Sequence, residues 1–271
     1  MPNIEIPTTI QLAHFDMAGT TIDDEVGVRS EEFGGKPLPI MIDGFQYGLA
    51  KIGIVASFND INKHRGAKKV DALYNIITEH RPDVDLDERW QMAIQAHDHF
   101  IQRGIELAER VQTKAGIIHL YQILKDSGVY VAVATGFPNE ITDSLIANLG
   151  WLDKGYVDLI VNAEQAGGGR PAPNMINFAL RDAGLLAIPN SDLCEVHPDF
   201  DYSIVMKVGD TSKDVEEGLK VGALTIATLE GTQTLETITS KGQPNYIVEY
   251  TRDIISFINS GTIVLKPYKP K

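Results

Sequence analysis

Two groups of acidic residues each follow a mostly apolar stretch, and carboxylates in such places can bind a metal or attack a substrate. Asp16 comes directly after residues 12–15, and Asp210 and Asp214 follow residues 203–208. Alone, Asp16 would more simply begin a turn or cap a helix. The carboxyl ends of buried parallel strands, however, meet in the crevice where α/β proteins bind ligands. Two acidic groups at that edge would form the two sides of one Mg²⁺ site.

The elements that would position these residues alternate between strand and helix, and this alternation predicts a doubly wound parallel α/β sheet. Apolar stretches of strand length occur at 10–15, 129–134, 156–161, 203–208, 223–227 and 246–248. Amphipathic stretches predict helices at 117–124, 141–149, 174–183, 213–221 and 251–258. The end of the chain, from residue 267, is expected to lack regular structure.

The segment from residue 39 to residue 112 has a different period. Its apolar residues recur at helical spacing, and it carries almost no strand signal. This pattern predicts a bundle of helices that is inserted between two core strands. We therefore expect a core formed by residues 1–27 and 113–271, and an α-helical cap formed by residues 28–112.

The connections between core and cap are expected to be irregular. Residues 23–35 are acidic and then glycine-containing, which is typical of a linker. A cap of this kind would be a mobile lid that excludes water from Asp16. Its hinges are expected near Gly27 and residues 112–116.

The composition excludes several classes of protein. The net charge of −13 lacks the basic face that binding to a phosphate backbone requires, so neither nucleic acid nor an anionic membrane is an expected partner. The single cysteine, Cys194, cannot form an internal disulfide. No apolar run approaches the ~20 residues of a membrane helix, and residues 1–7 carry no signal-peptide pattern. A cytoplasmic protein is expected.

Four motifs stand in order along the chain, each at a strand end or in a loop. They are Asp16-Met17-Ala18-Gly19-Thr20-Thr21, Thr135-Gly136-Phe137, Gly169-Arg170-Pro171 and Gly209-Asp210-Thr211-Ser212-Lys213-Asp214. In this order they resemble the haloacid dehalogenase superfamily of phosphoryl-transfer hydrolases and, within it, the phosphonatase-like group. The resemblance covers nearly the whole chain and implies a haloacid dehalogenase-like core with an inserted helical cap.

The resemblance also implies a role for each motif. Asp16 would be the nucleophile and form an aspartyl-phosphate. Arg170 would orient Asp16 and neutralise phosphate, although as an isolated residue it could be a surface arginine. Phosphate oxygens would be bound by Thr135 and the backbone of Gly136. The Mg²⁺ ligands would be Asp16, the backbone carbonyl of Ala18, Asp210 and Asp214.

Ala18 departs from the broad superfamily, whose phosphatases carry an aspartate two residues after the nucleophile as acid and base for the leaving oxygen. The phosphonatase group also has alanine there, because its substrate has a C–P bond and an iminium on a cap lysine accepts the electrons. Alignment on Gly66 and Asp71 places Lys69 at that position. Lys68 and Lys69 could equally be solvated charges on a cap helix.

Two further departures concern the same segment. Phosphonatase carries a histidine where this chain has Ala72, and a methionine where it has Arg65. Of the histidines that could substitute, His64 is nearest to the lysines in sequence, whereas the others are more typical of packing or solvated positions: His14, His97 and His99.

Three functions follow, with different discriminating features. Ala18 and Lys69 favour cleavage of a small phosphonate by a phosphonoacetaldehyde hydrolase-like reaction, and Ala72 and Arg65 favour hydrolysis of a small phosphomonoester. A non-catalytic phosphometabolite-binding module is disfavoured, because none of the motif residues is lost. A dinucleotide-binding oxidoreductase is rejected, because glycines 167–169 do not follow a Rossmann first strand. A cap helix with spare apolar surface could form a homodimer, as in phosphonatase.

Overall fold

The computed structural model of the 271-residue chain describes residues 8–64 and 69–269. It divides into two compact units. The core unit comprises Met1–Asp23, Thr113–Asn139 and Gly150–Lys271, and the helical unit comprises Asp24–Gln112 and Glu140–Leu149. This division differs from the expected one at two places, because residues 24–27 and 140–149 belong to the helical unit.

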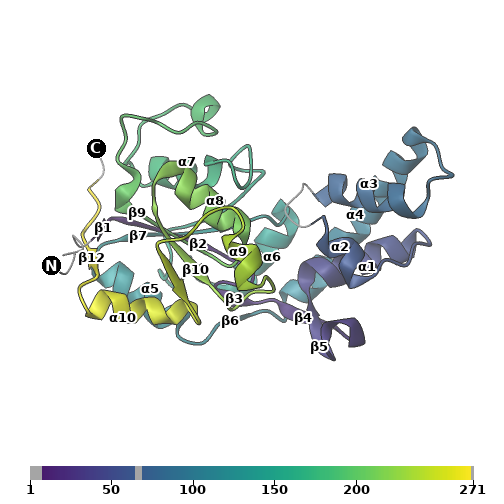
Figure 1. The fold of residues 1–271 in the computed structure, drawn as a ribbon, viewed down its shortest axis with the longest axis horizontal. Coiled ribbons are helices and arrows are strands. Elements are labelled where there is room, and N and C mark those ends of the chain that lie inside the picture. The colour runs from purple at the N-terminus through teal and green to yellow at the C-terminus, as the bar shows by residue number, and fades with distance from the viewer. Residues whose placement is uncertain (1–7, 65–68, 270–271) are drawn as a thin grey trace. The chain divides into compact units, whose positions relative to one another are not determined.

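The core unit is built on a parallel sheet of six strands in the order β11-β10-β9-β2-β7-β8 (Figure 1). The central strands β2, β7 and β9 are mostly apolar and wholly buried, as expected for a sheet that is covered on both faces. These strands agree with the expected ones to within a few residues. Their bounds are β2 Leu12–Asp16, β7 Tyr130–Thr135, β8 Leu159–Asn162, β9 Val205–Gly209, β10 Leu224–Thr228 and β11 Tyr246–Val248.

The strand order places a topological switch point between β2 and β9. From β2 the chain proceeds outward through β7 and β8, and it then returns to the other side of β2 to form β9, β10 and β11. Ligands of such sheets bind outside the carboxyl ends of the strands at the switch point. Asp16 ends β2 and Asp210 follows β9, so the two acidic groups of the sequence meet at this point.

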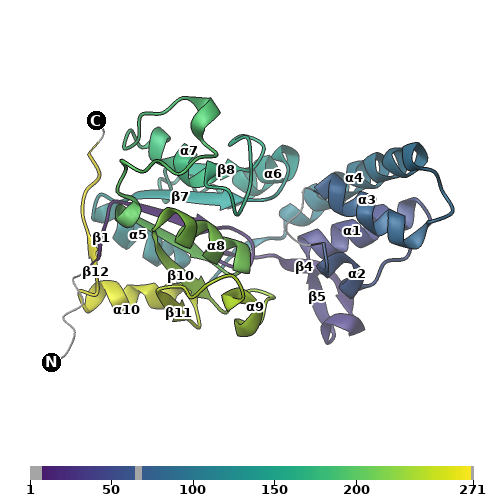
Figure 2. The same ribbon diagram turned by 45° about the horizontal axis from the view of Figure 1, so that its top comes forward.

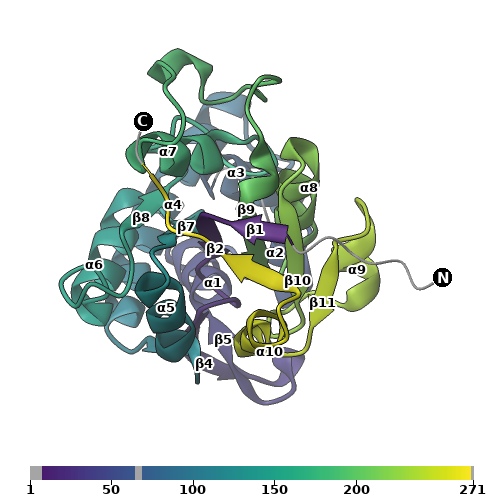
Figure 3. The same ribbon diagram turned by 90° about the vertical axis from the view of Figure 1, so that its left-hand side faces the viewer.

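Helices cover both faces of the sheet in the core unit (Figure 3). One face carries α7 (Asn174–Asp182) and α8 (Ser212–Val221), and the other carries α5 (Ile117–Asp126) and α10 (Ile254–Asn259). A short helix, α9 (Leu235–Thr239), lies between β10 and β11 in sequence. The predicted doubly wound α/β fold is confirmed.

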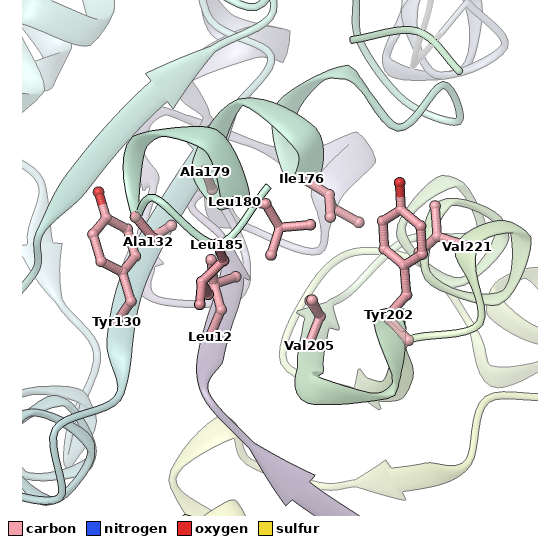
Figure 4. Close-up of a cluster of buried hydrophobic side chains, with 12 residues drawn as sticks. Leu12, Tyr130, Ala132, Ile176, Ala179, Leu180, Leu185, Tyr202, Val205 and Val221 are labelled. Atoms are coloured by element: carbon pink, nitrogen blue, oxygen red, sulfur yellow. The ribbon is translucent and has the colours of Figure 1, made fainter. Parts of the chain in front are cut away.

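The apolar core under α7 ties the sheet to this helix (Figure 4). Leu12 of β2 and Tyr130 of β7 pack with Ile176 and Leu180 of α7, and with Val205 of β9. All five side chains are almost completely excluded from water. Burial of each such apolar side chain contributes about 2 kcal/mol, so this cluster holds the ends of three strands in register.

A second, smaller sheet corrects the expectation for the first strand. Ile10 belongs to β1 (Thr8–Ile10), which ends before Gln11 and pairs in parallel with β12 (Ile263–Leu265). The strand β12 was not predicted from the sequence. A lone three-residue strand carries too little periodicity to be recognised, and its partner lies at the other end of the chain.

The helical unit consists mainly of long helices with one pair of strands. Its helices are α1 (Ile40–Lys51), α2 (Phe58–Asn62), α3 (Lys69–His80), α4 (Leu86–Ala108) and α6 (Asn139–Leu149, of which Asn139 belongs to the core unit). Two glycines of α1, Gly44 and Gly48, allow close approach to α4, because a Cβ at Gly48 would lie 2.3 Å from the carbonyl oxygen of Ala96.

The segment 23–35, which was expected to be an irregular linker, is mostly ordered. It contains β4 (Glu25–Ser30), which pairs in antiparallel fashion with β5 (Lys36–Pro39), and a short 3-10 helix (Glu31–Phe33) between them. Gly34 and Gly35 make the turn with φ angles of 65° and 75°. The expectation of a linker was therefore wrong for this segment, because its glycines serve a hairpin turn.

The remaining elements are short. β3 (Ile22–Asp23) pairs with β6 (Gln112–Thr113), and 3-10 helices occur at Asn190–Asp192, Tyr202–Ile204 and Thr251–Asp253. Arg65, Gly66 and Lys68 of the predicted lysine segment lie outside the described residues. Among the helices of the described ranges, shown from a second direction in Figure 2, none is long and apolar enough to cross a lipid bilayer.

Candidate active site

Asp16 lies at the carboxyl end of the central strand and is almost fully buried. Its Oδ1 is 2.6 Å from Nη2 of Arg170. The turn that follows is fixed by Thr21, whose hydroxyl donates to the carbonyl oxygens of Asp16 and Met17 at 3.1 Å. Gly19, with a φ of 82°, allows the chain to reverse directly beyond the carboxylate.

Asp210 directly follows β9 and is enclosed by backbone. The Thr20 hydroxyl donates to its Oδ1 at 3.0 Å, which joins the turn after β2 to the end of β9. A Cβ placed on Gly231 would lie only 1.8 Å from Oδ2 of Asp210, and one placed on Gly19 would lie 2.6 Å from the same atom. Glycine is therefore required at both positions, because the backbone itself forms the wall around this carboxylate.

Asp214 sits in the first turn of α8 and closes a capping box with Thr211. Its Oδ2 accepts hydrogen bonds from the hydroxyl and the amide of Thr211. Its Oδ1 is 2.9 Å from Nε of Arg170 and 2.9 Å from Nζ of Lys207. Burial opposes ionisation, but Arg170 and Lys207 outweigh it and hold the pKa of Asp214 below its ordinary value.

Arg170 connects these carboxylates. Besides Asp16 and Asp214, its guanidinium contacts the Ala134 carbonyl at 3.0 Å and Oε2 of Glu217 at 3.5 Å. Burial alone would lower its pKa, but Asp16, Asp214 and Glu217 raise the pKa well above the ordinary value. The Arg170 side chain is only 13% exposed, so it is not a surface arginine.

The charges of the site suit a divalent cation. Asp16, Asp210 and Asp214 each offer a carboxylate oxygen within 4.8 Å of the others. With Glu217 there are four buried carboxylates beside two cations, Arg170 and Lys207, which leaves an excess of two negative charges. Burial, with a further contribution from Asp214, raises the pKa of Asp16 although Arg170 opposes the rise. A hard cation bound by oxygens would remove this excess.

The predicted phosphate-binding residues lie at the end of the neighbouring strand. Thr135 is the last residue of β7, is 2% exposed, and accepts a hydrogen bond from the Phe137 amide at 3.1 Å. Gly136 is exposed, and a Cβ placed there would meet no atom within 4 Å. Because Asp16 aligns with Ala134 in the sheet, both residues follow directly beyond the level of the nucleophile.

The other predicted site residues have different surroundings. Ala18 is in the turn after β2 and is partly exposed. Lys69 belongs to the helical unit, where it begins α3 and its Nζ lies 3.6 Å from the Met41 sulfur. His64 pairs with Glu79 at 3.0 Å on the surface of the same unit, and His14 is completely buried in β2, as expected for a core histidine.

Two charged residues at the site were not predicted from the sequence. Lys207 lies in the middle of β9, and Glu217 lies in the second turn of α8, and both are completely buried. Their ion pair measures 2.8 Å. A lysine between Met206 and Val208 of an apolar strand was a visible signal, because a charge in a buried strand requires partners.

Comparison with known proteins identifies the family. Residues 10–222 match the family model of the haloacid dehalogenase-like hydrolases. A phosphonoacetaldehyde hydrolase of Latilactobacillus sakei is 26% identical over 243 residues, which cover 84% of this chain and 78% of that protein.

Solved structures show the same fold at low identity. A hydrolase from Pseudomonas syringae superposes with a TM-score of 0.68 at 16% identity, covering 92% of this chain and 98% of that one. A phosphonoacetaldehyde hydrolase-like protein from Oleispira antarctica superposes with a TM-score of 0.67 at 17% identity. The superposition covers 97% of this chain and 96% of that one. The chain belongs to the haloacid dehalogenase-like hydrolases, and its relatives include phosphonatases.

Proposed function

We propose that this chain is an Mg²⁺-dependent hydrolase that releases phosphate from a small phosphonate or phosphorylated metabolite through an aspartyl-phosphate on Asp16. One observation carries the proposal: the buried Asp16 carboxylate, at the switch point of the sheet, lies against Arg170 and within reach of Asp210 and Asp214. An arrangement with excess negative charge is costly in a binding module and is useful where a cation and a phosphoryl group must meet.

Each residue of the site has a part in this reaction. A carboxylate oxygen of Asp16 attacks phosphorus, and the guanidinium of Arg170 holds the nucleophile and neutralises the phosphoryl oxygens. Thr135 and the Gly136 amide bind the same oxygens. Mg²⁺, held by Asp16, the Ala18 carbonyl, Asp210 and Asp214, would supply further charge neutralisation. Water then cleaves the aspartyl-phosphate and regenerates the carboxylate.

Phosphonoacetaldehyde is the first candidate substrate. No carboxylate stands at Ala18 to protonate a leaving oxygen, which suits a leaving group that is carbon. In the proposed reaction the Lys69 amine condenses with the aldehyde, and water leaves. When the C–P bond breaks, its electron pair enters the iminium and forms an enamine, while phosphorus becomes bonded to Asp16. Protonation and hydrolysis of the enamine release acetaldehyde.

The surroundings of Lys69 support this role. The residue is half-buried at the start of α3, beside the thioether of Met41, which is a weak hydrogen-bond acceptor. A lysine that forms an iminium must react as the neutral amine. The similarity to proteins named phosphonoacetaldehyde hydrolase supports the same substrate.

A specific observation favours phosphomonoesters as the second candidate. Ala72 stands where the phosphonatase group carries histidine, and it is 1% exposed within α3. This position therefore supplies no acid or base to the reaction. If the substrate is an ester, its leaving oxygen must take a proton from the substrate, from water or from another residue of the helical unit.

The test measures phosphate release from phosphonoacetaldehyde and from a panel of small phosphomonoesters, with and without Mg²⁺. Wild type should act on the phosphonate, and borohydride added during turnover should reduce the iminium and label Lys69, as detected by mass spectrometry. Lys69→Arg is the matched control: it keeps the positive charge, and it should be neither labelled nor active on the phosphonate.

The outcomes separate the candidates. Release from esters alone, with an unlabelled Lys69, would assign the phosphatase function and contradict the iminium. Activity on neither class, or full activity of Asp16→Asn, would refute the proposed reaction altogether.

A further inference from the structure

Two cations and two carboxylates form a closed buried arrangement behind Asp16. We call it the charge square; it consists of Lys207, Arg170, Asp214 and Glu217. The Lys207 ammonium is 2.9 Å from Oδ1 of Asp214 and 2.8 Å from Oε2 of Glu217. The Nε of Arg170 lies 2.9 and 3.5 Å from the same two oxygens. Both cations therefore share both carboxylates, and the square as a whole is neutral.

Lys207 has an unusual place for a lysine. Its backbone is in the middle of β9, paired with His14 of β2 on one side and Thr225 of β10 on the other. The whole residue is excluded from water. Burying an ammonium group costs several kcal/mol unless the group is paired. Two well-packed apolar residues in place of a buried ion pair usually make a protein equally stable. Stability alone therefore does not explain why the strand carries a charge here.

The square reaches the nucleophile through Arg170. One end of the guanidinium, at Nε, faces the square, and the other, at Nη2, lies 2.6 Å from Asp16 and 3.0 Å from the Ala134 carbonyl. If the charge of Lys207 were absent, two buried carboxylates would depend on Arg170 alone. Their attraction would draw the guanidinium away from Asp16.

His14 does not alter this charge count. Its Nδ1 is 3.5 Å from the Lys207 ammonium. Burial first, and then the neighbouring Lys207 and Arg170, lower the pKa of His14 well below its ordinary value. A neutral imidazole can accept a hydrogen bond from the ammonium without adding charge.

We propose that Lys207 and Glu217 are positioning residues: by mutual compensation they hold Arg170 on Asp16 and leave the site with the two excess negative charges that a divalent cation balances. The effect on turnover rests on the proposed function. The effect on cation binding does not, because it follows from the charges alone.

The test measures Mn²⁺ binding to the purified full chain, and the electron paramagnetic resonance signal of the free ion reports how much Mn²⁺ remains unbound. Lys207→Met removes a positive charge, so Mn²⁺ should bind about tenfold more tightly, and Glu217→Gln should weaken binding about tenfold. The double variant Lys207→Met/Glu217→Gln restores neutrality and should bind within about threefold of wild type. General damage to the fold would weaken binding in both single variants.

Turnover is the second readout in the same variants. Lys207→Met should lower kcat about 100-fold, with little change in KM, because Arg170 no longer holds Asp16. The double variant should regain most of this loss. Thr225→Val is the matched control: Thr225 is buried beside Lys207 in the sheet, its hydroxyl donates to the Ala223 carbonyl, and its loss should leave binding and turnover unchanged.

Weaker Mn²⁺ binding in both single variants, with losses that add in the double variant, would overturn the proposal, and so would wild-type behaviour of Lys207→Met. If Lys207→Met does not fold, Glu217→Gln and the double variant still decide, since the second should recover what the first loses. A wild type that releases no phosphate from any substrate would refute the proposed function but leave the Mn²⁺ test intact.

Discussion

The two units each contain a buried pair of one arginine and one aspartate, and the two pairs are nearly identical in geometry. In the core unit, Nη2 of Arg170 lies 2.6 Å from Oδ1 of Asp16, and the two side chains are 13% and 7% exposed, respectively. In the helical unit, Nε of Arg103 lies 2.7 Å from Oδ1 of Asp43, and the two side chains are 15% and 3% exposed, respectively. Neither distance nor burial distinguishes the proposed catalytic pair from the structural one.

The neighbours of each pair make the difference. Asp43 has a second donor, the Val28 amide at 2.6 Å, and Arg103 has a second carboxylate in the more exposed Glu106. Glu106 is 49% exposed and therefore solvated, so the buried charges of Arg103 and Asp43 balance each other. This pair joins β4, α1 and α4. Around Asp16, by contrast, carboxylates outnumber cations. An unbalanced charge inside a protein indicates a bound ion or substrate, whereas a balanced one is sufficiently explained by folding.

The aspartates should differ most. Asp16→Asn should lower kcat by more than about 10⁴-fold, because the proposed covalent intermediate forms on the Asp16 carboxylate. The variant should keep or raise the melting temperature, since it relieves the excess of negative charge. Asp43→Asn should leave kcat within about threefold of wild type but cost about 3 kcal/mol of unfolding free energy, since Arg103 loses its buried partner.

Phosphate-release assays and urea unfolding of both variants make this measurement. A large loss of kcat in Asp43→Asn with normal stability would contradict the distinction between the two pairs, as would a strongly destabilised Asp16→Asn that retains turnover.

Substitution of the two arginines should also separate turnover from stability, with a smaller loss of kcat than Asp16→Asn causes. Arg170→Met should lower kcat about 10³-fold. Arg170→Lys should lower kcat less, because an ammonium can reach Asp16. Some loss of kcat should remain, because the ammonium cannot contact Glu217 at the same time. Arg103→Met should instead lower stability by about 3 kcal/mol. Steady-state kinetics and unfolding curves test both; equal kcat for the methionine and lysine variants at position 170 would argue against a role in orientation.

Substitution of the glycines whose backbone lies against Asp210 and Asp43 should give the smallest effects. Gly231→Ala would place a methyl group 1.8 Å from Asp210 Oδ2, so Asp210 must shift, and Mn²⁺ affinity should fall at least about tenfold. Gly27→Ala would place one 2.6 Å from Asp43 and should cost about 1 to 2 kcal/mol of stability without changing Mn²⁺ affinity. Unchanged affinity in Gly231→Ala would show that Asp210 is not held by this wall.

Much of the core was predictable because its signals are local. Buried parallel strands are continuous apolar runs, and this sufficed to locate the sheet and to bring Asp16 and Asp210 to one edge. The resemblance added Arg170, whose loop would otherwise have suggested a surface residue. The contacts of Arg170 with Asp16 and Asp214 agree with the expected role.

The features that were missed depend on partners far away in sequence. Lys207 and Glu217 gain their meaning only when β9 and α8 are packed together, and β12 only when it meets β1 at the other end of the chain. Residues 23–35 predict a linker but form β4 and the turn of its hairpin with β5, because acidic residues and glycines are common to both kinds of segment. In each case tertiary contacts decide what short sequence patterns leave open.

The grouping of α6 has a consequence for protein engineering. Its Ile141 packs on Gly104 of α4, and its Asn148 donates to the carbonyls of Ala108 and Val111. The helical unit is thus assembled from two separate pieces of chain, and the backbone crosses between the units four times. A truncated or chimeric protein made by cutting out residues 24–112 would leave Ile141 without the α4 surface on which it packs. Transplanting the unit into a homologue therefore requires that α6 travel with it, or that its apolar side be redesigned.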